Sequence, residues 1–277
     1  MSKKTEQNYN QLHQYFSNLD SVLIAFSGGV DSALLAWVAY NALGNKMRAV
    51  LADSPSLARH EKKEAENFIN EHQIPFEIVR TNEMQKNDYL ANAGDRCYYC
   101  KLSLFERMEI LQTSLNGSSG LNWKIAYGVN QDDLGDYRPG MNAAREHNVL
   151  TPYLDYEIGK EGIRDICRSL GLSVAEKIAM PCLSSRIPHG ELVTEEKLTQ
   201  IEKGEFFLKK IGLVEFRVRH HGDLARIEVS DSDFSFLIQS KQEVLQFFKS
   251  LNFLFVTIDI APFKSGSLNS TLKRAKV

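Results

Sequence analysis

The chain has 277 residues, of which 43% are hydrophobic and 25% are charged, and its formal net charge is −2 at pH 7. This balance is typical of a globular protein with enough apolar residues for one large domain or two ordinary ones. The weak negative charge argues against nucleic acid as the main partner, and no apolar run approaches the ~18–20 residues of a membrane span.

Residues 1–16 contain two lysines but no apolar stretch of the kind found in signal peptides, so we expect a cytoplasmic protein with no membrane partner. The four cysteines do not make a disulfide framework in a chain of this length. In a reducing compartment they are core thiols, metal ligands or reactive groups.

The first half of the chain alternates short β-rich runs with helical patterns. This order predicts an α/β fold, an open parallel sheet with helices on both faces, over residues 1–185. The expected strands are 22–27, 47–53, 76–81, 124–130 and a short fifth at 149–153, and the expected helices are 31–43, 60–72 and 98–115, with a loop at 116–122.

The pattern changes at residues 180–191, which contain two prolines and no clear period. We expect a small α+β domain over 190–277, beginning with a helix at 194–211 that Thr194 caps. Two strands then flank a turn at 221–223. We expect His220 and His221 to be turn residues rather than ligands. A helix at 241–251 and a strand at 253–260 complete the prediction.

The sequence Ser-Gly-Gly-Val-Asp-Ser at 27–32 lies where the first strand turns into a helix. The first N–H groups of a helix have no internal partners, and glycines let the backbone approach phosphate oxygens. The stretch therefore predicts a phosphate-binding loop, although it lacks the lysine of a Walker A motif. A glycine-rich turn selected only for close packing is the alternative.

An acidic loop follows the fourth predicted strand. Gly128 is followed by Asp132, Asp133 and Asp136. Ligands of open parallel sheets gather at the carboxyl ends of the strands, so these residues are expected on the same rim as Ser27. We expect Gly128 to touch a nucleotide and Asp133 to serve Mg²⁺; a solvated acidic loop is the alternative.

Three of the four cysteines are candidates for chemistry. Cys97 and Cys100 form a C-x-x-C at a helix start, where a thiol pKa is lowered, and Cys182 lies in a proline-flanked loop. Three kinds of site fit these cysteines. They could hold zinc if His189, near Cys182, is the fourth ligand, or the C-x-x-C pair could be a redox dithiol. The three thiolates could also hold three corners of a [4Fe–4S] cluster. Cys167 lies on an apolar helical face and is expected in the core.

The stretch from Ala25 to Ser32 resembles the PP-loop of the adenine nucleotide α-hydrolase-like superfamily, which includes NAD and GMP synthetases and tRNA-thiolating enzymes. The resemblance implies a loop that binds the β,γ-pyrophosphate of ATP while a substrate oxygen attacks the α-phosphorus. It also implies that Asp31 lies near Mg²⁺. The residues that it assigns to ATP are Ala25, Ser27, Gly28, Gly29, Asp31, Ser32, Asp53, Ser54, Arg59 and Gly128.

Four motifs occur in the order found in LarE-type ATP-dependent sulfur transferases: AFSGGVDSALL, RCYYCK, YGVNQDDLGDYRPG and PCLSSRI. FRVRHHGDLARIEV is similar to the C-terminal part of the same family, so the resemblance covers nearly the whole chain. It implies an enzyme that adenylylates a carboxylate of pyridinium-3,5-biscarboxylic acid mononucleotide and converts it to a thiocarboxylate, in the synthesis of the nickel-pincer nucleotide cofactor.

The family has two branches that differ in their source of sulfur. In one, the cysteine of the PCL loop gives up its own sulfur and becomes dehydroalanine, and that branch lacks the C-x-x-C pair. In the other, three cysteines hold a [4Fe–4S] cluster whose extra sulfide is transferred. Because Cys97 and Cys100 accompany Cys182, the chain resembles the cluster branch, with Cys182 as sulfur donor as the alternative.

Sulfur anions and carboxylates repel each other, so positive charge is expected at the site of transfer. Arg186 follows Cys182 by four residues, Arg217 and Arg219 share one face of a predicted strand, and Arg226 lies on its partner. We expect these arginines to bind the phosphate and carboxylates of the substrate, with Arg186 also catalytic. The alternative is a solvated strand face on which Glu215 and Glu228 pair with the arginines. We favour binding for Arg217 and Arg219, and the two interpretations are equal for Arg226.

Two other functions compete: an amide-forming or tRNA-thiolating ligase of the same superfamily, and a sensor that binds ATP without catalysis. Pyrophosphate release that depends on a carboxylate substrate would exclude the sensor. By family analogy we expect a homo-oligomer, a hexamer, that hands its product to the nickel-inserting enzyme of the pathway.

Overall fold

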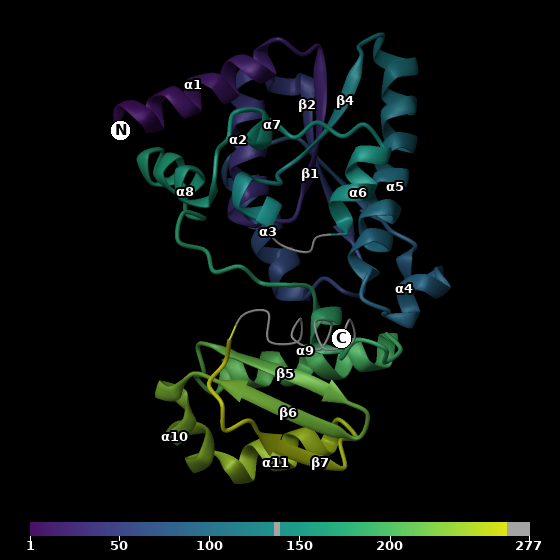
Figure 1. Cartoon of the computed structure of the whole chain (residues 1–277), viewed down its shortest axis with the longest axis vertical. Helices are drawn as coiled ribbons and strands as arrows, with labels where there is room; N and C mark the ends of the chain where they lie inside the picture. Colours follow the sequence, from purple (N-terminus) through teal and green to yellow (C-terminus); the bar gives the residue numbers. More distant parts are fainter. Residues whose placement is uncertain (136–138, 265–277) are drawn as a thin grey trace. The chain divides into compact units, whose positions relative to one another are not determined.

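The computed structural model describes residues 1–135 and 139–264 (Figure 1). The chain folds into two compact units. The first is Met1–Glu83 with Cys97–Met180, and the second is Met84–Arg96 with the described residues from Pro181 on, 181–264. No sequence pattern indicated that the short segment Met84–Arg96 would join the second unit.

The first unit contains a parallel sheet, as the alternating sequence pattern predicted. Its described strands are ordered β3-β2-β1-β4. Every residue of the central strand β1 is buried, which is typical of a parallel strand covered on both faces. The strands are β1 (Ser21–Phe26), β2 (Met47–Asp53), β3 (Phe76–Arg80) and β4 (Trp123–Tyr127).

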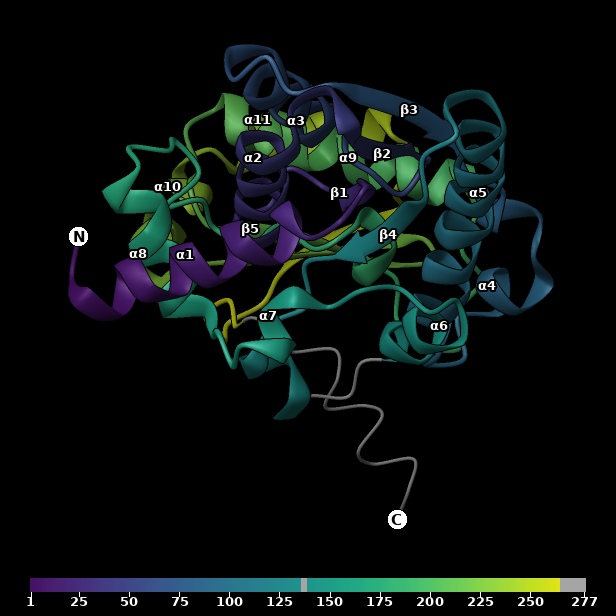
Figure 2. The same cartoon turned by 90° about the horizontal axis from the view of Figure 1, so that it is seen from above.

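Helices cover both faces of this sheet, which confirms the predicted α/β fold; Figure 2 shows α2 and α5 on opposite sides. Val22, Ile24 and Phe26 pack in one apolar cluster and Leu23 and Ala25 in another, as the alternation of side chains along a strand requires. The helices are α1 (Lys3–Ser17), α2 (Val30–Leu43), α3 (Arg59–Glu71), α5 (Arg96–Ser119), α6 (Gly140–Glu146), α7 (Pro152–Asp155) and α8 (Lys160–Ser169).

Two predicted elements of the first unit were wrong. The expected fifth strand at 149–153 is a single bridge between Ala126 and Leu150, because Pro152 begins α7. The expected loop at 116–122 is mostly the last turn of α5. Its Asn-Gly-Ser-Ser composition favours a turn, but the helix continues to Ser119, and the chain leaves helical geometry at Gly120, which has φ +67°.

The second unit builds its core between a small sheet and helices. β5 (Phe216–His221) and β6 (Leu224–Val229) form the predicted hairpin, and β7 (Phe255–Ile258) joins β6 in parallel. Thr194 caps α9 as predicted, by accepting a hydrogen bond from the Lys197 N–H at 3.2 Å. The helices are α4 (Asn87–Ala91), α9 (Glu195–Lys210), α10 (Asp231–Gln239) and α11 (Lys241–Ser250).

The two histidines of the hairpin were predicted as turn residues, which is wrong: His220 and His221 are the last residues of β5, and His220 is buried. Cross-strand pairing explains this, since His220 is opposite Ala225. Across the described ranges, no helix has the length and apolar character that a membrane crossing needs.

Candidate functional site

The turn between β1 and α2 has the geometry of an anion site. Gly29 is the N-cap residue of α2, and no described side chain caps the helix there. Gly28 has φ +75°, and a Cβ on it would lie 2.6 Å from the Cβ of Ala65 in α3. Only glycine fits, and the first N–H groups of α2 are left to a ligand.

The two serines of this loop have different surroundings. The Ser32 hydroxyl accepts a hydrogen bond from the Ser27 N–H at 3.1 Å and donates one to the Gly29 carbonyl at 3.1 Å. Ser32 is buried, so it holds the loop in shape. Ser27 is exposed, and its hydroxyl lies 3.2 Å from that of Ser32. Of the two side chains, only that of Ser27 is exposed, so its hydroxyl is the one that stays a candidate for contact with a phosphate.

Gly128 follows β4 and lies against the first turn of α2. A Cβ there would lie 3.2 Å from the Asp31 carbonyl carbon and 3.2 Å from the Ser32 nitrogen. The close approach explains why glycine occupies this position. Gly128 is therefore on the same rim as the Gly28 loop, and Ala25, buried in β1, lies beneath that rim.

Asp31 is held by residues far away in the sequence. Its Oδ2 lies 2.5 Å from the Lys160 Nζ, and its Oδ1 accepts a hydrogen bond from the Asn130 amide at 3.4 Å. The Tyr153 hydroxyl donates to the Asp31 carbonyl at 2.8 Å. Sequence reasoning missed Lys160, although a Gly-Lys pair opening a helical pattern was a visible signal. This lysine supplies the positive charge that the loop itself lacks.

The acidic loop after β4 folds back on itself around Asn130. The Asn130 N–H donates to Asp133 Oδ2 at 3.0 Å, and the Asp132 N–H donates to Asn130 Oδ1 at 3.0 Å. Asp132 also accepts a hydrogen bond from the Lys160 N–H at 2.6 Å. Asp31 and Asp133, the two predicted Mg²⁺ ligands, thus contact the same asparagine. Asp136 lies outside the described residues.

Charged side chains meet at the end of β2, where contacts with ATP were predicted. Asp53 accepts hydrogen bonds from Arg59 and Lys62, each at 2.6 Å. Burial raises the pKa of Asp53, but hydrogen bonds from Lys62 and Arg59 outweigh it and hold that pKa below its usual value. The Ser54 hydroxyl donates to the buried carboxylate of Glu83.

None of the four cysteines forms a disulfide. Cys97 is exposed and Cys100 is half-buried, in the first turns of α5. A Cβ on Gly140 would lie 3.2 Å from the Cys97 carbonyl oxygen, so α6 begins against this turn. Cys167 is fully buried, as predicted, and burial raises its pKa to about 12. No group of three or more His, Cys, Asp or Glu that could hold a metal ion is found among the described residues.

Cys182 precedes a short 3₁₀ turn, Leu183–Arg186, and is half-buried. Arg186 is 1% exposed. Its Nε and Nη2 donate to the two carboxylate oxygens of Glu205, each at 2.9 Å. Its Nη1 donates to the carbonyls of Pro181 at 2.5 Å and Cys182 at 3.1 Å. In this structure the guanidinium fastens the Cys182 loop to α9.

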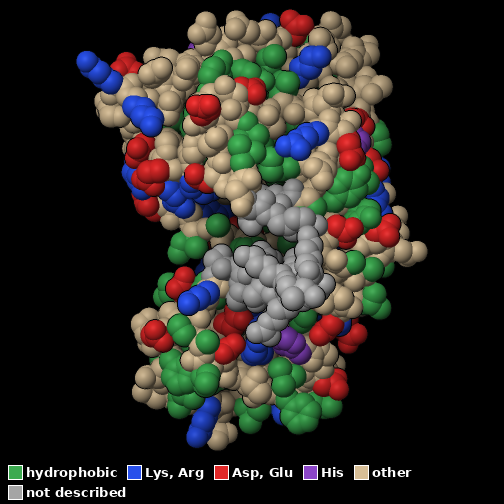
Figure 3. Space-filling view, in the orientation of Figure 1, with side chains coloured by type: hydrophobic (Ala, Val, Ile, Leu, Met, Phe, Trp, Pro, Cys, Tyr) green, Lys and Arg blue, Asp and Glu red, His purple; other side chains and the backbone are tan. Residues whose placement is uncertain are grey.

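The second unit buries more positive than negative charge. Among its described residues, four arginines are buried (Arg96, Arg186, Arg217 and Arg219) against two glutamates (Glu205 and Glu228). Arg219 pairs with Glu228 at 2.7 Å and donates to the Ser185 carbonyl at 3.1 Å, and Arg226 lies 3.1 Å from Glu228. The exposed face in Figure 3 instead mixes both signs of charge.

Arg217 has no ion pair with any described residue. It is 7% exposed, donates to the Phe216 carbonyl at 2.6 Å, and lies 4.6 Å from the ring centre of Phe263. Burial, with repulsion from Arg186 next, lowers the pKa of Arg217 to about 10. A buried guanidinium without a carboxylate is costly, and an anionic ligand would offset that cost.

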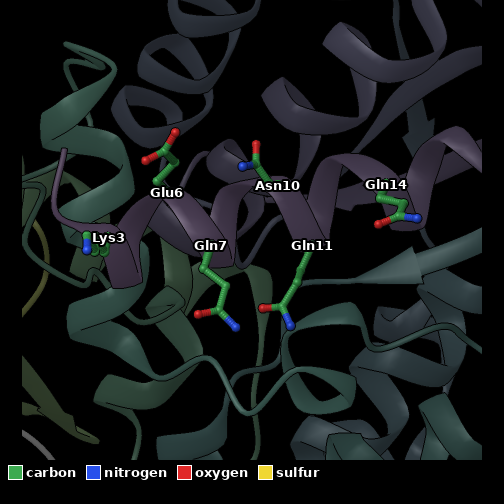
Figure 4. A pocket seen from close by; sticks show the side chains of 6 residues that line it. All are labelled: Lys3, Glu6, Gln7, Asn10, Gln11 and Gln14. Carbon is green, nitrogen blue, oxygen red and sulfur yellow. The ribbon is translucent and has the colours of Figure 1, made fainter.

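A hollow of about 380 Å³ lies along one face of α1 (Figure 4). It contains none of the cysteines, arginines or loop residues described above. The residues that line it are Lys3, Glu6, Gln7, Asn10, Gln11 and Gln14. We assign no part of the site to it.

Comparisons with known proteins agree with this geometry. The NAD synthase family model matches residues 5–99, which include the Gly28 loop. An uncharacterised protein of Synechocystis is 42% identical over 97% of this chain and 99% of its own length. The pyridinium-3,5-bisthiocarboxylic acid mononucleotide synthase of Lactiplantibacillus plantarum is 30% identical over 94% of this chain and 93% of its own length. The chain belongs to the LarE family of PP-loop proteins.

Membership makes the chain an ATP-using, sulfur-transferring enzyme. A subunit of GMP synthase from Saccharolobus islandicus is 24% identical over 72% of this chain, a weaker similarity. The β1–α2 loop is therefore the PP-loop. The roles of the individual site residues stay predictions.

Proposed function

We propose that the chain adenylylates a carboxylate of pyridinium-3,5-biscarboxylic acid mononucleotide and replaces one carboxylate oxygen with sulfur, in the synthesis of a nickel-pincer nucleotide cofactor. The similarity to the L. plantarum synthase supports this substrate. The observation that carries the proposal is the buried guanidinium of Arg217, which pairs with no carboxylate of a described residue and lies within an excess of buried arginines. A substrate with one phosphate and two carboxylates supplies the missing negative charge.

In the first unit, the proposed chemistry is adenylylation. A carboxylate oxygen of the substrate attacks the α-phosphorus of ATP, the bond to the β-phosphate oxygen breaks, and pyrophosphate leaves. The N–H groups at the start of α2 and the Lys160 ammonium stabilise the charge of the leaving group. Asp31 and Asp133 would hold Mg²⁺, which neutralises the phosphates when bound.

In the second unit, the proposed roles are binding and delivery. Arg217, with Arg219 and Arg226, would bind the phosphate and carboxylates of the substrate. Arg186 contacts the carbonyl of Cys182 directly, so its catalytic part would be to hold the Cys182 loop while sulfur attacks. Sulfur attacks the carbonyl carbon of the acyl-adenylate, the carbon–oxygen bond to AMP breaks, and AMP leaves with that oxygen.

The proposed sulfur source is a [4Fe–4S] cluster held by Cys97, Cys100 and Cys182. The donor set fits in its chemistry: the thiols are not in disulfides, none of the three is fully buried, and two are three residues apart at a helix start. When bound, such a cluster would supply the transferable sulfide. Loss of sulfur from Cys182 itself is the competing source.

Anaerobic purification followed by iron and acid-labile sulfide analysis tests the source. We expect both elements in the wild type, their loss in Cys97→Ser, and their retention in Cys167→Ser, which changes only a core thiol. Iron-free wild-type protein that still forms product would contradict the cluster. Conversion of Cys182 to dehydroalanine after a single turnover, seen by mass spectrometry, would then establish the competing source.

The remaining parts of the proposal concern partners. By analogy with the family, the chain would act as a cytoplasmic homo-oligomer, a hexamer, and pass its product to a nickel-inserting enzyme. Analytical ultracentrifugation tests the assembly; a monomer at micromolar concentration would contradict it.

A further inference from the structure

The segment Met84–Arg96 leaves the first unit after Glu83 and returns at Cys97. Between these points it packs within the second unit, on the loop that carries Cys182. The Gly190 N–H donates to the Asn92 carbonyl at 2.9 Å, and the Val193 N–H donates to the Leu90 carbonyl at 2.9 Å. Nothing in the chemistry proposed above explains this excursion of the chain.

Asn92 is the centre of the contact. It is fully buried and has φ +53°, a left-handed conformation that asparagine tolerates better than most residues. Its side-chain amide donates to the carbonyls of Ile187 at 3.3 Å, Pro188 at 2.8 Å and Glu191 at 3.2 Å. One side chain thus fixes the backbone of the loop that follows Arg186.

Arg96 extends the contact toward Cys182. Its Nη1 donates to the Asn92 Oδ1 at 2.5 Å and to the Ser184 carbonyl at 2.9 Å. The Tyr89 hydroxyl lies 2.7 Å from the Ser184 hydroxyl. Arg96 is 6% exposed and has no ion pair with a described residue. Among the described residues, only neutral carbonyl and amide oxygens accept hydrogen bonds from this buried charge. Burying a charge in this way costs free energy that an uncharged side chain would not cost.

The position of Arg96 in the sequence shows what its hydrogen bond to Ser184 connects. Arg96 is bonded directly to Cys97, and Ser184 follows Cys182 by two residues. The Arg96–Ser184 hydrogen bond therefore joins the residue that precedes the C-x-x-C pair to the loop of the third cysteine. A rigid link of this kind fixes the loop in one conformation before any ligand binds.

We propose that Arg96 is a positioning residue, and that the bracket Met84–Arg96 holds the Cys182 loop in the conformation that sulfur transfer needs. The sulfur chemistry in this statement rests on the function proposed above. The conformational part does not, because it concerns contacts within the second unit of the ligand-free chain.

The test compares Arg96→Gln with Arg107→Gln, which removes an exposed arginine from the same helix. In metal-free protein, iodoacetamide labelling of each cysteine is followed by peptide mass spectrometry. We expect Cys182 to react at least about tenfold faster in Arg96→Gln, because the hydrogen bonds of Arg96 to Asn92 and Ser184 are lost and each contributes about that much. Arg107→Gln should react at the wild-type rate, and Cys167 should stay protected in both.

A second readout separates positioning from general damage. With ATP and the carboxylate substrate, Arg96→Gln should release pyrophosphate at the wild-type rate but form about tenfold less thiocarboxylate. Equal Cys182 labelling in Arg96→Gln and wild type would overturn the inference. If Cys167 becomes reactive in Arg96→Gln, the core of that variant has unfolded. Arg96→Lys, which keeps the charge, then replaces it, and its Cys182 labelling rate is compared with that of the wild type. If the wild type makes no thiocarboxylate, the proposed function is wrong. The labelling rates still test whether the bracket fixes the conformation of the Cys182 loop.

Discussion

The two units build their candidate anion sites from different materials. In the first, the PP-loop offers backbone N–H groups at the start of α2, and glycines at positions 28 and 128 allow the close approaches. In the second, buried guanidinium groups of Arg186, Arg217 and Arg219 provide the charge, with Glu205 and Glu228 holding two of them. One site depends on backbone shape and the other on buried side-chain charge.

This difference sets how each site responds to change. A backbone site carries no fixed charge, so it fails when a side chain alters the path of the turn. A site of buried charges fails when one partner is removed, because the other is left unpaired in the interior. Substitutions in the two sites should therefore have different consequences.

Removing Glu205 should have the largest effect on stability. Glu205→Ala leaves the buried Arg186 without its carboxylate and should lower the free energy of unfolding by about 3–5 kcal/mol. Urea unfolding followed by circular dichroism measures this. Glu176→Ala removes a fully exposed partner of Arg168 and should cause no measurable change. Equal loss in the two variants would show that burial of the pair is unimportant.

A side chain at position 28 of the PP-loop should abolish most pyrophosphate release from ATP. Gly28→Ala forces a Cβ into Ala65 at positive φ, so pyrophosphate release should fall by about a hundredfold, the cost of an ångström-scale displacement. Gly44→Ala is the matched control, since Gly44 also has positive φ but a Cβ there meets no described atom within 4 Å. Steady-state kinetics measures both; a Gly28→Ala enzyme as active as Gly44→Ala would contradict the assignment.

The same contrast explains what could be predicted from the sequence. The PP-loop, the acidic loop and the parallel sheet follow from local patterns, because a glycine turn between strand and helix has few conformations. The hairpin and the Thr194 cap are equally local. The expected strand at 149–153 failed because a short apolar run does not reveal whether it finds a neighbour or meets Pro152.

Partners distant in sequence could not be predicted. Arg186 precedes Glu205 by nineteen residues, and Lys160 follows Asp31 by 129. No period or motif links such pairs; only the fold brings them together. Sequence reasoning named the arginines and, of the carboxylates that pair with them, Glu228 but not Glu205. It missed Lys160 and the bracket altogether.

Lys160→Gln should weaken the binding of ATP, with an effect smaller than that of Gly28→Ala on pyrophosphate release. It removes the cation beside Asp31 while keeping a polar side chain, and we expect ATP to bind about tenfold more weakly, the value of one hydrogen bond to a charged group. Isothermal titration calorimetry measures the affinity. Lys124→Gln, an exposed change on β4, should leave it unchanged. Tighter binding in Lys160→Gln would mean that the lysine obstructs the site.

The smallest expected effect is on how the free energy of unfolding depends on pH. Burial, and then repulsion from Lys197, lowers the pKa of His220 to about 4. Because the unfolded value is about 6.5, the neutral histidine leaves stability intact above that pH, and stability falls as the pH drops toward 4. We expect a loss of about 1 kcal/mol between about pH 7 and 5.5 that His220→Gln lacks. Identical pH profiles from urea unfolding would place the sensitive group elsewhere.

The most direct test of the central claim is pyrophosphate release with pyridinium-3,5-biscarboxylic acid mononucleotide, in the wild type, Asp31→Ala and Asp20→Ala, an exposed aspartate before β1. We expect release by the wild type and Asp20→Ala only when the carboxylate substrate is present, and none by Asp31→Ala. Release by Asp31→Ala at the wild-type rate, or release without a carboxylate, would contradict the claim.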